Sequence, residues 1–202
     1  MSELHFDEPT HTYSVAGRIV PNVTRIIGHL TDFSRVDPEV LEKARQQGVA
    51  VHKMVELDCA EELDVEALPD WMAGHYAAWL RFKEETGFEC LSAEQRVYHP
   101  GLNYAGTLDL AARLPKLNIK GAALIDVKRS FYAGPAIGLQ LAGYEEARNK
   151  TPDREPTYHR FALRLDADGK YRLQKYDDRG DFAVFLACLT LYRWREKNAA
   201  NG

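Results

Sequence analysis

The chain has 202 residues, of which 45% are hydrophobic and 28% are charged, the composition of one globular domain with a sizeable core. The formal net charge of -4 excludes a generally basic coat for nucleic acid, but it is compatible with a local basic groove beside an acidic site. No run of about 18 or more apolar residues is present, so neither a membrane-spanning helix nor a membrane partner is expected.

The N-terminal part of the chain predicts a hairpin and then helices. Alternation around Ala16-Gly17 in HTYSVAGRIV favours a hairpin, and PNVTRIIGHL begins a short helix. Asp37 is the expected N-cap of a long helix, Pro38 lies in its first turn, and Gly87 should end the next helix. The residues expected on the inward faces of these two helices are Leu41, Ala44, Val51 and Val55, and then Trp71, Ala78, Trp79 and Phe82.

The rest of the chain mixes strand and helix patterns. Short strands are expected within 90–99, 104–114 and 122–130, and a helix opened by Pro135 follows within 134–150. Two more strands flank DADGKY, which we interpret as a hairpin turn and not a calcium loop. A closing helix over 181–198 has aromatic residues that are expected mainly in the core: Phe182, Phe185 and Trp194. This order predicts an α/β fold, a central mixed β-sheet flanked by helices, in a single domain with an N-terminal hairpin and helical extension.

Two carboxylates and a lysine lie inside the apolar strand patterns. Asp126 and Lys128 share one face of their strand, and antiparallel pairing with the preceding strand would bring Asp109 opposite or diagonal to Asp126. Two carboxylates about 4 Å apart repel by roughly 4 kcal/mol at an effective dielectric near 20, and a divalent cation removes that conflict. The alternative is an ordinary salt bridge on a solvated strand face.

Four motifs in order resemble the PD-(D/E)xK nuclease superfamily, especially its RecB-like branch. They are GVAVHKMVE, GTLDL with Asp109, IDVK with Asp126 and Lys128, and QLAGY with Gln140 and Tyr144. GRIVPNVTRII is also similar to an element of some phage nucleases and of the mitochondrial genome-maintenance exonuclease. The resemblance covers about residues 13 to 145 and implies a restriction-endonuclease-like core.

The resemblance also implies roles for particular residues. Asp109, Asp126 and the main-chain carbonyl of Val127 would bind Mg²⁺ or Mn²⁺, as one or two ions, and His52 would complete the coordination. Lys128 would help activate the attacking water. Asp126 stands where many members carry glutamate, and its shorter side chain could alter the metal geometry.

Further motif residues have open interpretations. Gly48, His52 and Glu56 form one stripe of a helix, where the glycine would allow a close approach to a neighbouring element and Glu56 is either solvated or supports the site. Gln140 and Tyr144 would contact the DNA backbone or support the lysine, or they are polar residues of a surface helix. Glu94 is expected to be a solvated strand residue, with a role in supporting the metal as the alternative.

The function implied is that of a metal-dependent deoxyribonuclease, with an exonuclease favoured, that leaves 5′-phosphates on single- or double-stranded DNA ends. Alternatives are a non-cleaving nucleic-acid or protein-binding module and a structure- or sequence-specific endonuclease. A role in phage-type recombination or repair, with a strand-annealing partner, is expected by analogy alone, and the oligomeric state is left open.

The cysteines and the N-terminus bear on cofactor and compartment. Some relatives bind an iron–sulfur cluster through four cysteines, but this chain has three, Cys59, Cys90 and Cys188, so no cluster is expected. They favour reduced thiols, and MSELHFDEPT has no apolar signal core. We therefore expect a cytoplasmic protein, encoded by a phage or prophage if the analogy holds.

Overall fold

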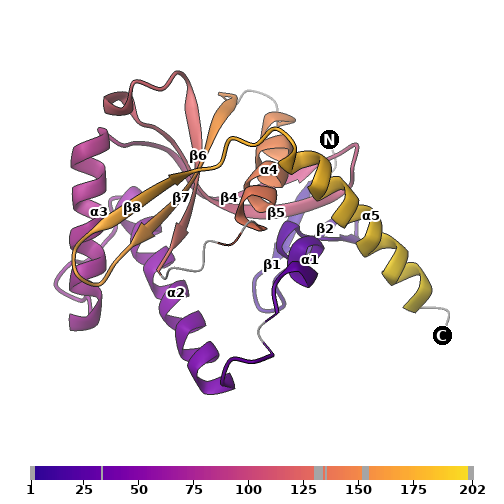
Figure 1. Cartoon of the computed structure of the whole chain (residues 1–202), viewed down its shortest axis with the longest axis horizontal. Helices are drawn as coiled ribbons and strands as arrows, with labels where there is room; N and C mark the ends of the chain where they lie inside the picture. The colour runs from indigo at the N-terminus through magenta and orange to yellow at the C-terminus, as the bar shows by residue number, and fades with distance from the viewer. Residues whose placement is uncertain (1–2, 33, 130–133, 135, 152–154, 200–202) are drawn as a thin grey trace.

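The computed structural model describes residues 3–32, 34–129, 134, 136–151 and 155–199, and it contains a small and a large β-sheet (Figure 1). The small sheet is antiparallel, in the order β1 (Leu4–Asp7), β2 (Thr12–Val15) and β3 (Arg18–Val20). Val15 pairs with Arg18 across Ala16 and Gly17, whose φ angles are 50° and 73°. This confirms the predicted hairpin, and β1 is an additional strand that the sequence analysis did not predict.

Two helices follow the small sheet. Helix α1 (Val23–Ile27) is capped by the Asn22 side chain, and the 3-10 turn η1 (Gly28–Leu30) follows it. Helix α2 (Pro38–Cys59) begins as predicted, because the Asp37 carboxylate accepts hydrogen bonds from the first free backbone N–H groups. The buried residues of α2 are Val51, Met54 and Val55. The first half of α2 reaches away from the sheets (Figure 1), so the expected inward residues Leu41 and Ala44 are only partly buried.

The large sheet has five strands in sequence order: β4 (Glu89–His99), β5 (Tyr104–Arg113), β6 (Ala122–Lys128), β7 (Thr157–Leu165) and β8 (Tyr171–Lys175). All neighbours are antiparallel except β6 and β7, which are parallel and joined through helix α4 (Ala136–Asn149). The α/β class and the mixed sheet flanked by helices are therefore confirmed. The β7–β8 connection is a hairpin, with the Asp166 N–H donating to the Lys170 carbonyl at 2.8 Å. Residue 130 and Pro135, in the predicted strand and helix, lie outside the described residues.

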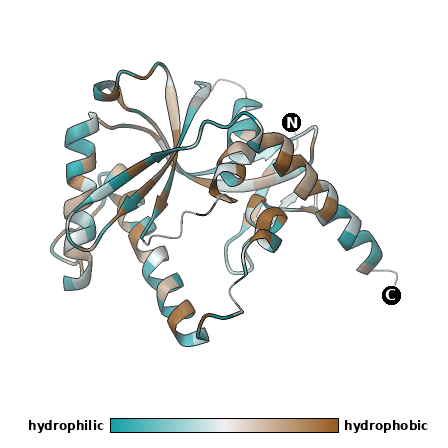
Figure 2. Cartoon of the chain, in the orientation of Figure 1, coloured by the Kyte–Doolittle hydropathy of each residue, from teal (hydrophilic) through white to brown (hydrophobic). Residues whose placement is uncertain are grey.

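Helices cover both faces of the large sheet. On one face, α2 and α3 (Ala73–Thr86) pack on a core that includes Trp79, Phe82, Ile125 and Val127; we call this the α3 face. On the other, the α4 face, α1, α4 and α5 (Asp181–Ala199) cover a core that includes Ile26, Leu124, Tyr144 and Phe185. Figure 2 shows hydrophobic residues concentrated where α4 and α5 meet, whereas the far end of α5 is mostly hydrophilic.

Two aromatic predictions are wrong. Trp71 is 39% exposed, since it lies in the 3-10 turn η2 (Asp70–Met72) before α3 and not on the packed face of that helix. Trp194 is 62% exposed because the last turns of α5 extend past the sheet (Figure 1). The other expected inward residues of α3, Ala78, Trp79 and Phe82, are fully buried.

None of the helices in the described part of the chain is long and apolar enough to cross a membrane.

Strands β5 and β6 separate at the point that matters most for the site. They pair only through Leu110–Ile125, Ala111–Leu124 and Ala112–Ala123. Beyond that short ladder β5 stays with β4, while β6 stays with β7 as far as Lys128. The next residues in this register are Asp109 and Asp126, at the base of the resulting fork.

Candidate active site

Asp109 and Asp126 lie across from each other where the ladder between β5 and β6 ends, as the predicted antiparallel pairing requires. The backbone N–H of Val127 donates to Asp109 Oδ2 at 2.6 Å and so replaces the missing strand pairing. The Val127 side chain points into the core of the α3 face and is 1% exposed, so Asp126 and Lys128 point the other way, as expected from strand alternation.

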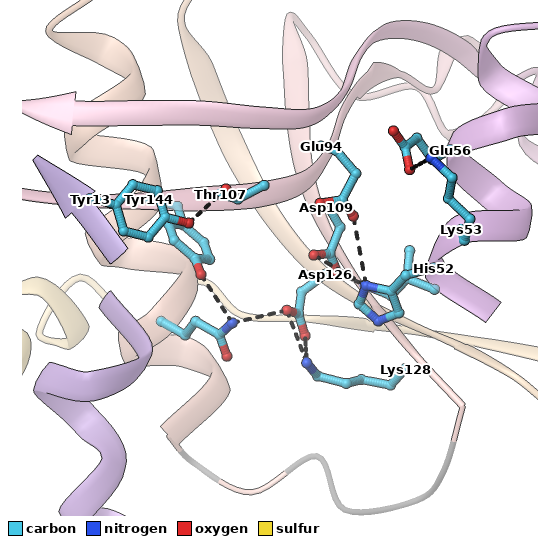
Figure 3. Close-up of polar contacts among 12 residues, drawn as sticks. Tyr13, His52, Lys53, Glu56, Glu94, Thr107, Asp109, Asp126, Lys128 and Tyr144 are labelled. Carbon is cyan, nitrogen blue, oxygen red and sulfur yellow. Dashed lines mark hydrogen bonds and ion pairs between the residues drawn. The ribbon is translucent and has the colours of Figure 1, made fainter. Parts of the chain in front are cut away.

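His52, Glu94 and Asp109 converge from three elements into one cluster (Figure 3). His52 Nδ1, on α2, is 3.5 Å from an Asp109 oxygen and 3.9 Å from a Glu94 oxygen. One ligand atom from each of the three lies within 4.8 Å of the other two. Two carboxylate oxygens and an imidazole nitrogen at this spacing match the donor chemistry of a divalent cation such as Mn²⁺ or Mg²⁺.

Glu94 is the member of the cluster for which the sequence favours a solvated position over a metal-supporting one, and the structure places it beside His52 and Asp109. In the register between β4 and β5, Ala93 pairs with Leu110 and Gln95 with Leu108, which places Glu94 across from Asp109. Glu94 has a φ of 43°, in the left-handed region that residues other than glycine seldom occupy. Such strain persists where the surroundings impose it and is concentrated at functional sites. Predicting the β4–β5 register would have identified Glu94, but its backbone conformation leaves no signal in the sequence.

Asp126 belongs to a second, adjoining set of contacts (Figure 3). Its carboxylate, 2% exposed, accepts from Lys128 Nζ at 3.1 Å, and the same nitrogen is 2.9 Å from the other oxygen. Gln140 Nε2 on α4 donates to Asp126 at 3.3 Å and to the Tyr144 hydroxyl at 3.5 Å. Gln140 therefore contacts the partner of Lys128, which fits the supporting role better than a role as a surface residue.

Tyr144 is held against β5 by the absence of a side chain at Gly106. A Cβ atom at Gly106 would lie 2.5 Å from the Tyr144 ring, so only glycine lets α4 pack this closely over the site. Tyr144 is 5% exposed and lines the pocket. The expectation for Gly48 is different: a Cβ there would meet nothing within 4 Å, so this glycine is not required for close helix packing.

The charged groups shift one another's pKa values. Burial raises the pKa of Asp109, but the positive charges of His52 and Lys128 and the Val127 N–H outweigh it and lower the pKa. For Asp126 burial dominates, and the nearby Asp109 charge adds to it, so the pKa is raised despite Lys128. Two carboxylates that share one site are expected to divide in this way.

Two cationic groups balance these acids. Burial lowers the pKa of His52, but Asp109 and Glu94 raise it to about 10, so the imidazole is protonated at neutral pH when no metal is bound. Burial likewise lowers the pKa of Lys128, yet Asp126 and Asp109 raise it above its ordinary value. Lys128 is therefore a charged hydrogen-bond donor and not a base.

All of these groups face one open pocket of about 760 Å³. Basic side chains also line it, among them Arg96 and Arg129. Arg129 follows Lys128 directly, and its buried Nε has no hydrogen-bond partner among the described residues. A buried guanidinium nitrogen without a partner is a natural contact for a phosphate oxygen.

Glu56 lines the pocket too, but its carboxylate pairs with Lys53 at 2.8 Å and not with the cluster of His52, Glu94 and Asp109.

The cysteines lie apart from this cluster and are free thiols. Cys59 packs on the α3 face, where the neighbouring Cys90 thiol and burial raise the pKa of its thiol, and Cys188 is buried on the α4 face. Cys188 is thus separated from the other two by the large sheet.

Comparison with known proteins identifies no family. No family model matches the chain, and no curated protein does. Among the solved structures that match is one described as "Crystal structure of SSO0001", with 14% identity and a TM-score of 0.35. The match covers 59% of this chain and spans 56% of that one. A similarity at this level assigns neither the fold family nor a function.

Proposed function

We propose that this chain is a metal-dependent deoxyribonuclease of the PD-(D/E)xK type, RecB-like and with a restriction-endonuclease-like core, which removes nucleotides from DNA ends. The observation that supports it is the convergence of His52, Glu94 and Asp109 with the Asp126–Lys128 pair in one pocket. These groups come from α2, β4, β5 and β6, so neither local sequence nor a single surface ion pair accounts for their meeting.

In the proposed reaction, water attacks phosphorus in line with the 3′-oxygen and gives a proton to solvent, while the bond from phosphorus to the 3′-oxygen breaks. The 3′-oxygen takes up a proton from solvent and leaves as a hydroxyl, and the 5′-phosphate is released. A divalent cation at His52, Glu94 and Asp109 would supply Lewis-acid stabilisation of the phosphate charge. Lys128, fixed by Asp126 and kept protonated, donates to the attacking water or to a phosphate oxygen. Gln140 holds the Asp126 carboxylate in place.

The direct test is cleavage by the purified protein with Mn²⁺ or Mg²⁺. End-labelled linear DNA, single- and double-stranded, is compared with a closed circle of the same sequence. We expect loss of the linear ends, an intact circle and 5′-phosphate products. Lys128→Ala should abolish cleavage. The matched control is Lys175→Ala at the end of β8, which removes an ion pair with Asp177 and should leave cleavage unchanged.

Other outcomes identify the alternatives. Cutting of the closed circle would replace the exonuclease with an endonuclease. Binding of Mn²⁺ in calorimetry, without cleavage of any DNA, would mark a binding module that does not cut. A chain that neither binds the ion nor cuts contradicts the proposal.

A further inference from the structure

Part of the pocket lining comes from the small N-terminal sheet, which the proposed reaction does not use. Phe6 on β1 and His11 in the β1–β2 turn line the same pocket as His52, Asp109 and Lys128. Phe6 is partly buried and His11 is exposed. Two aromatic rings thus line a pocket that also holds several charged side chains.

These rings belong to an aromatic cluster that is hydrogen-bonded to β5, the strand that carries Asp109. The Phe6 ring lies 5.1 Å from that of His11 and 4.6 Å from that of Tyr13, measured between centroids. Tyr13 is buried, and its hydroxyl is 2.7 Å from the hydroxyl of Thr107, two residues before Asp109. The Ala105 N–H also donates to the Pro21 carbonyl at 2.9 Å, just after β3. The cluster of Phe6, His11 and Tyr13 is therefore held in a fixed position relative to Asp109.

A cation accompanies the rings. The Arg96 guanidinium lies 4.9 Å from the centre of the Phe6 ring, and Arg96 follows Glu94 by two residues on β4. Proteins that bind single strands combine aromatic rings, on which bases stack, with cations along the backbone. Inside a duplex each base face is covered by its neighbours, and only the outer face of a terminal pair is open, so rings beside a phosphate within the strand can stack only on an unpaired base.

His11 is informative because its ring is exposed, although it packs edge-on against Phe6 and Tyr13. Its φ of 50° lies in the left-handed region, where asparagine fits as well as histidine, and its ring is exposed beside the pocket. A residue chosen for the turn alone needs no ring. This makes His11→Asn a substitution that removes the ring and preserves the turn.

We infer that the exposed ring of His11, backed by the Phe6 ring, forms a stacking site for an unpaired nucleobase of a DNA strand beside the phosphate to be cleaved. This inference rests on the proposed function, which supplies the phosphate to be cleaved, but the stacking site itself can be tested by binding alone.

The test measures binding by fluorescence anisotropy in EDTA, so that no DNA is cut. Labelled single-stranded oligonucleotides, intact or with abasic positions near one end, are titrated with wild-type protein, His11→Asn and Phe6→Leu. We expect each variant to bind intact single strands roughly 5- to 100-fold more weakly. The abasic oligonucleotide should bind wild type as weakly as the intact one binds the variants.

Controls separate stacking from damage to the fold. Trp194→Leu removes the most exposed tryptophan, at the far end of α5, and should leave binding unchanged. Phe6→Leu keeps an apolar contact with Tyr13; if its thermal midpoint falls, His11→Asn decides the question. Unchanged affinity in His11→Asn and equal binding of intact and abasic strands by wild type would overturn the inference.

Cleavage in Mn²⁺ then distinguishes the two proposals. If wild type binds with the expected dependence on bases but cuts nothing, the stacking site stands and the nuclease proposal fails. If wild type cuts but neither variant changes the preference for single strands, the nuclease stands and the stacking site is wrong.

Discussion

Strands β5 and β6 hold two opposite environments a few residues apart. Where they pair, Leu110 to Ala112 and Ala123 to Ile125 are all buried apolar residues, with helices on both faces. Where they separate, the next residues are Asp109 and Asp126, and polar groups from α2, β4 and α4 replace the ladder. The same two strands thus form the core at one end and the candidate site at the other.

The difference shows how a buried acid can be kept. A carboxylate within the paired segment would have no partner and would be destabilising. At the fork, the lost strand pairing leaves the Val127 N–H free for Asp109, and Lys128 is close enough to hold Asp126. The end of a ladder is therefore a position where polar groups can be buried and satisfied, and it opens a pocket at the same time.

Removing the negative charge of Asp109 at the fork should have the largest effect on cleavage. Asp109→Asn keeps the shape and an oxygen for the Val127 N–H but loses an anionic ligand, so cleavage should fall by about 10³-fold or more. Because the substitution also removes the partner of the His52 imidazolium, the free energy of unfolding without metal should fall by about 1–3 kcal/mol in urea denaturation, so cleavage is compared per folded molecule. Full activity in this variant would remove Asp109 from the site.

The paired end should respond in the opposite way. Leu124→Ala, on the same face of β6 as Asp126, removes a side chain that is 1% exposed, so the free energy of unfolding should fall by about 2–5 kcal/mol. Cleavage per folded molecule should be unchanged at a temperature where the variant remains folded. A loss of activity in folded Leu124→Ala would show that the two ends are not independent.

Strand alternation and strand pairing predict the part of the site that lies on β5 and β6. The opposition of Asp109 and Asp126 and the shared face of Asp126 and Lys128 follow from the two-residue period of a strand. The α/β class follows from the order of elements. Helical spacing tells which residues share a face but not whether another element covers that face, so it wrongly predicts that Trp194 lies in the core.

Other features depend on tertiary contacts that leave no local pattern. Strand β1 is as short as β2, but the turn that joins them contains no glycine like that of Ala16-Gly17 to mark a hairpin. The left-handed backbone of Glu94 is set by its neighbours and not by its own preference, and the glycine that matters for close packing is Gly106, not Gly48.

Glu94 extends the comparison of the two ends of β5 and β6 to a third strand, because its carboxylate reaches the fork from β4. Glu94→Gln leaves a neutral oxygen in the cluster, so the dissociation constant for Mn²⁺ should rise roughly 10- to 100-fold in calorimetry. Glu56→Gln is the matched control: it lines the same pocket but pairs with Lys53, and it should change the constant little. Equal effects of the two substitutions would mean that general pocket charge, and not a ligand at Glu94, attracts the ion.

The last effect expected is a proton linkage at His52. With no ion bound, burial lowers its pKa but Asp109 and Glu94 raise it to about 10, so at neutral pH the imidazolium occupies the place of the cation. Mn²⁺ needs the neutral imidazole, so binding must displace that proton. The apparent affinity should therefore rise with pH, by up to about tenfold per unit, and level off near the pKa.

Calorimetry in buffers of different ionisation enthalpy would count the protons released when Mn²⁺ binds. His52→Asn keeps a polar side chain without a titrating proton, so its affinity should be lower and its release close to zero at neutral pH. The sign is opposite for the metal-free fold: the raised pKa means that the stabilising charge of His52 is present at neutral pH and is lost as the pH rises through about 10. A wild-type affinity that stays flat with pH would show that His52 faces the two acids without binding the ion.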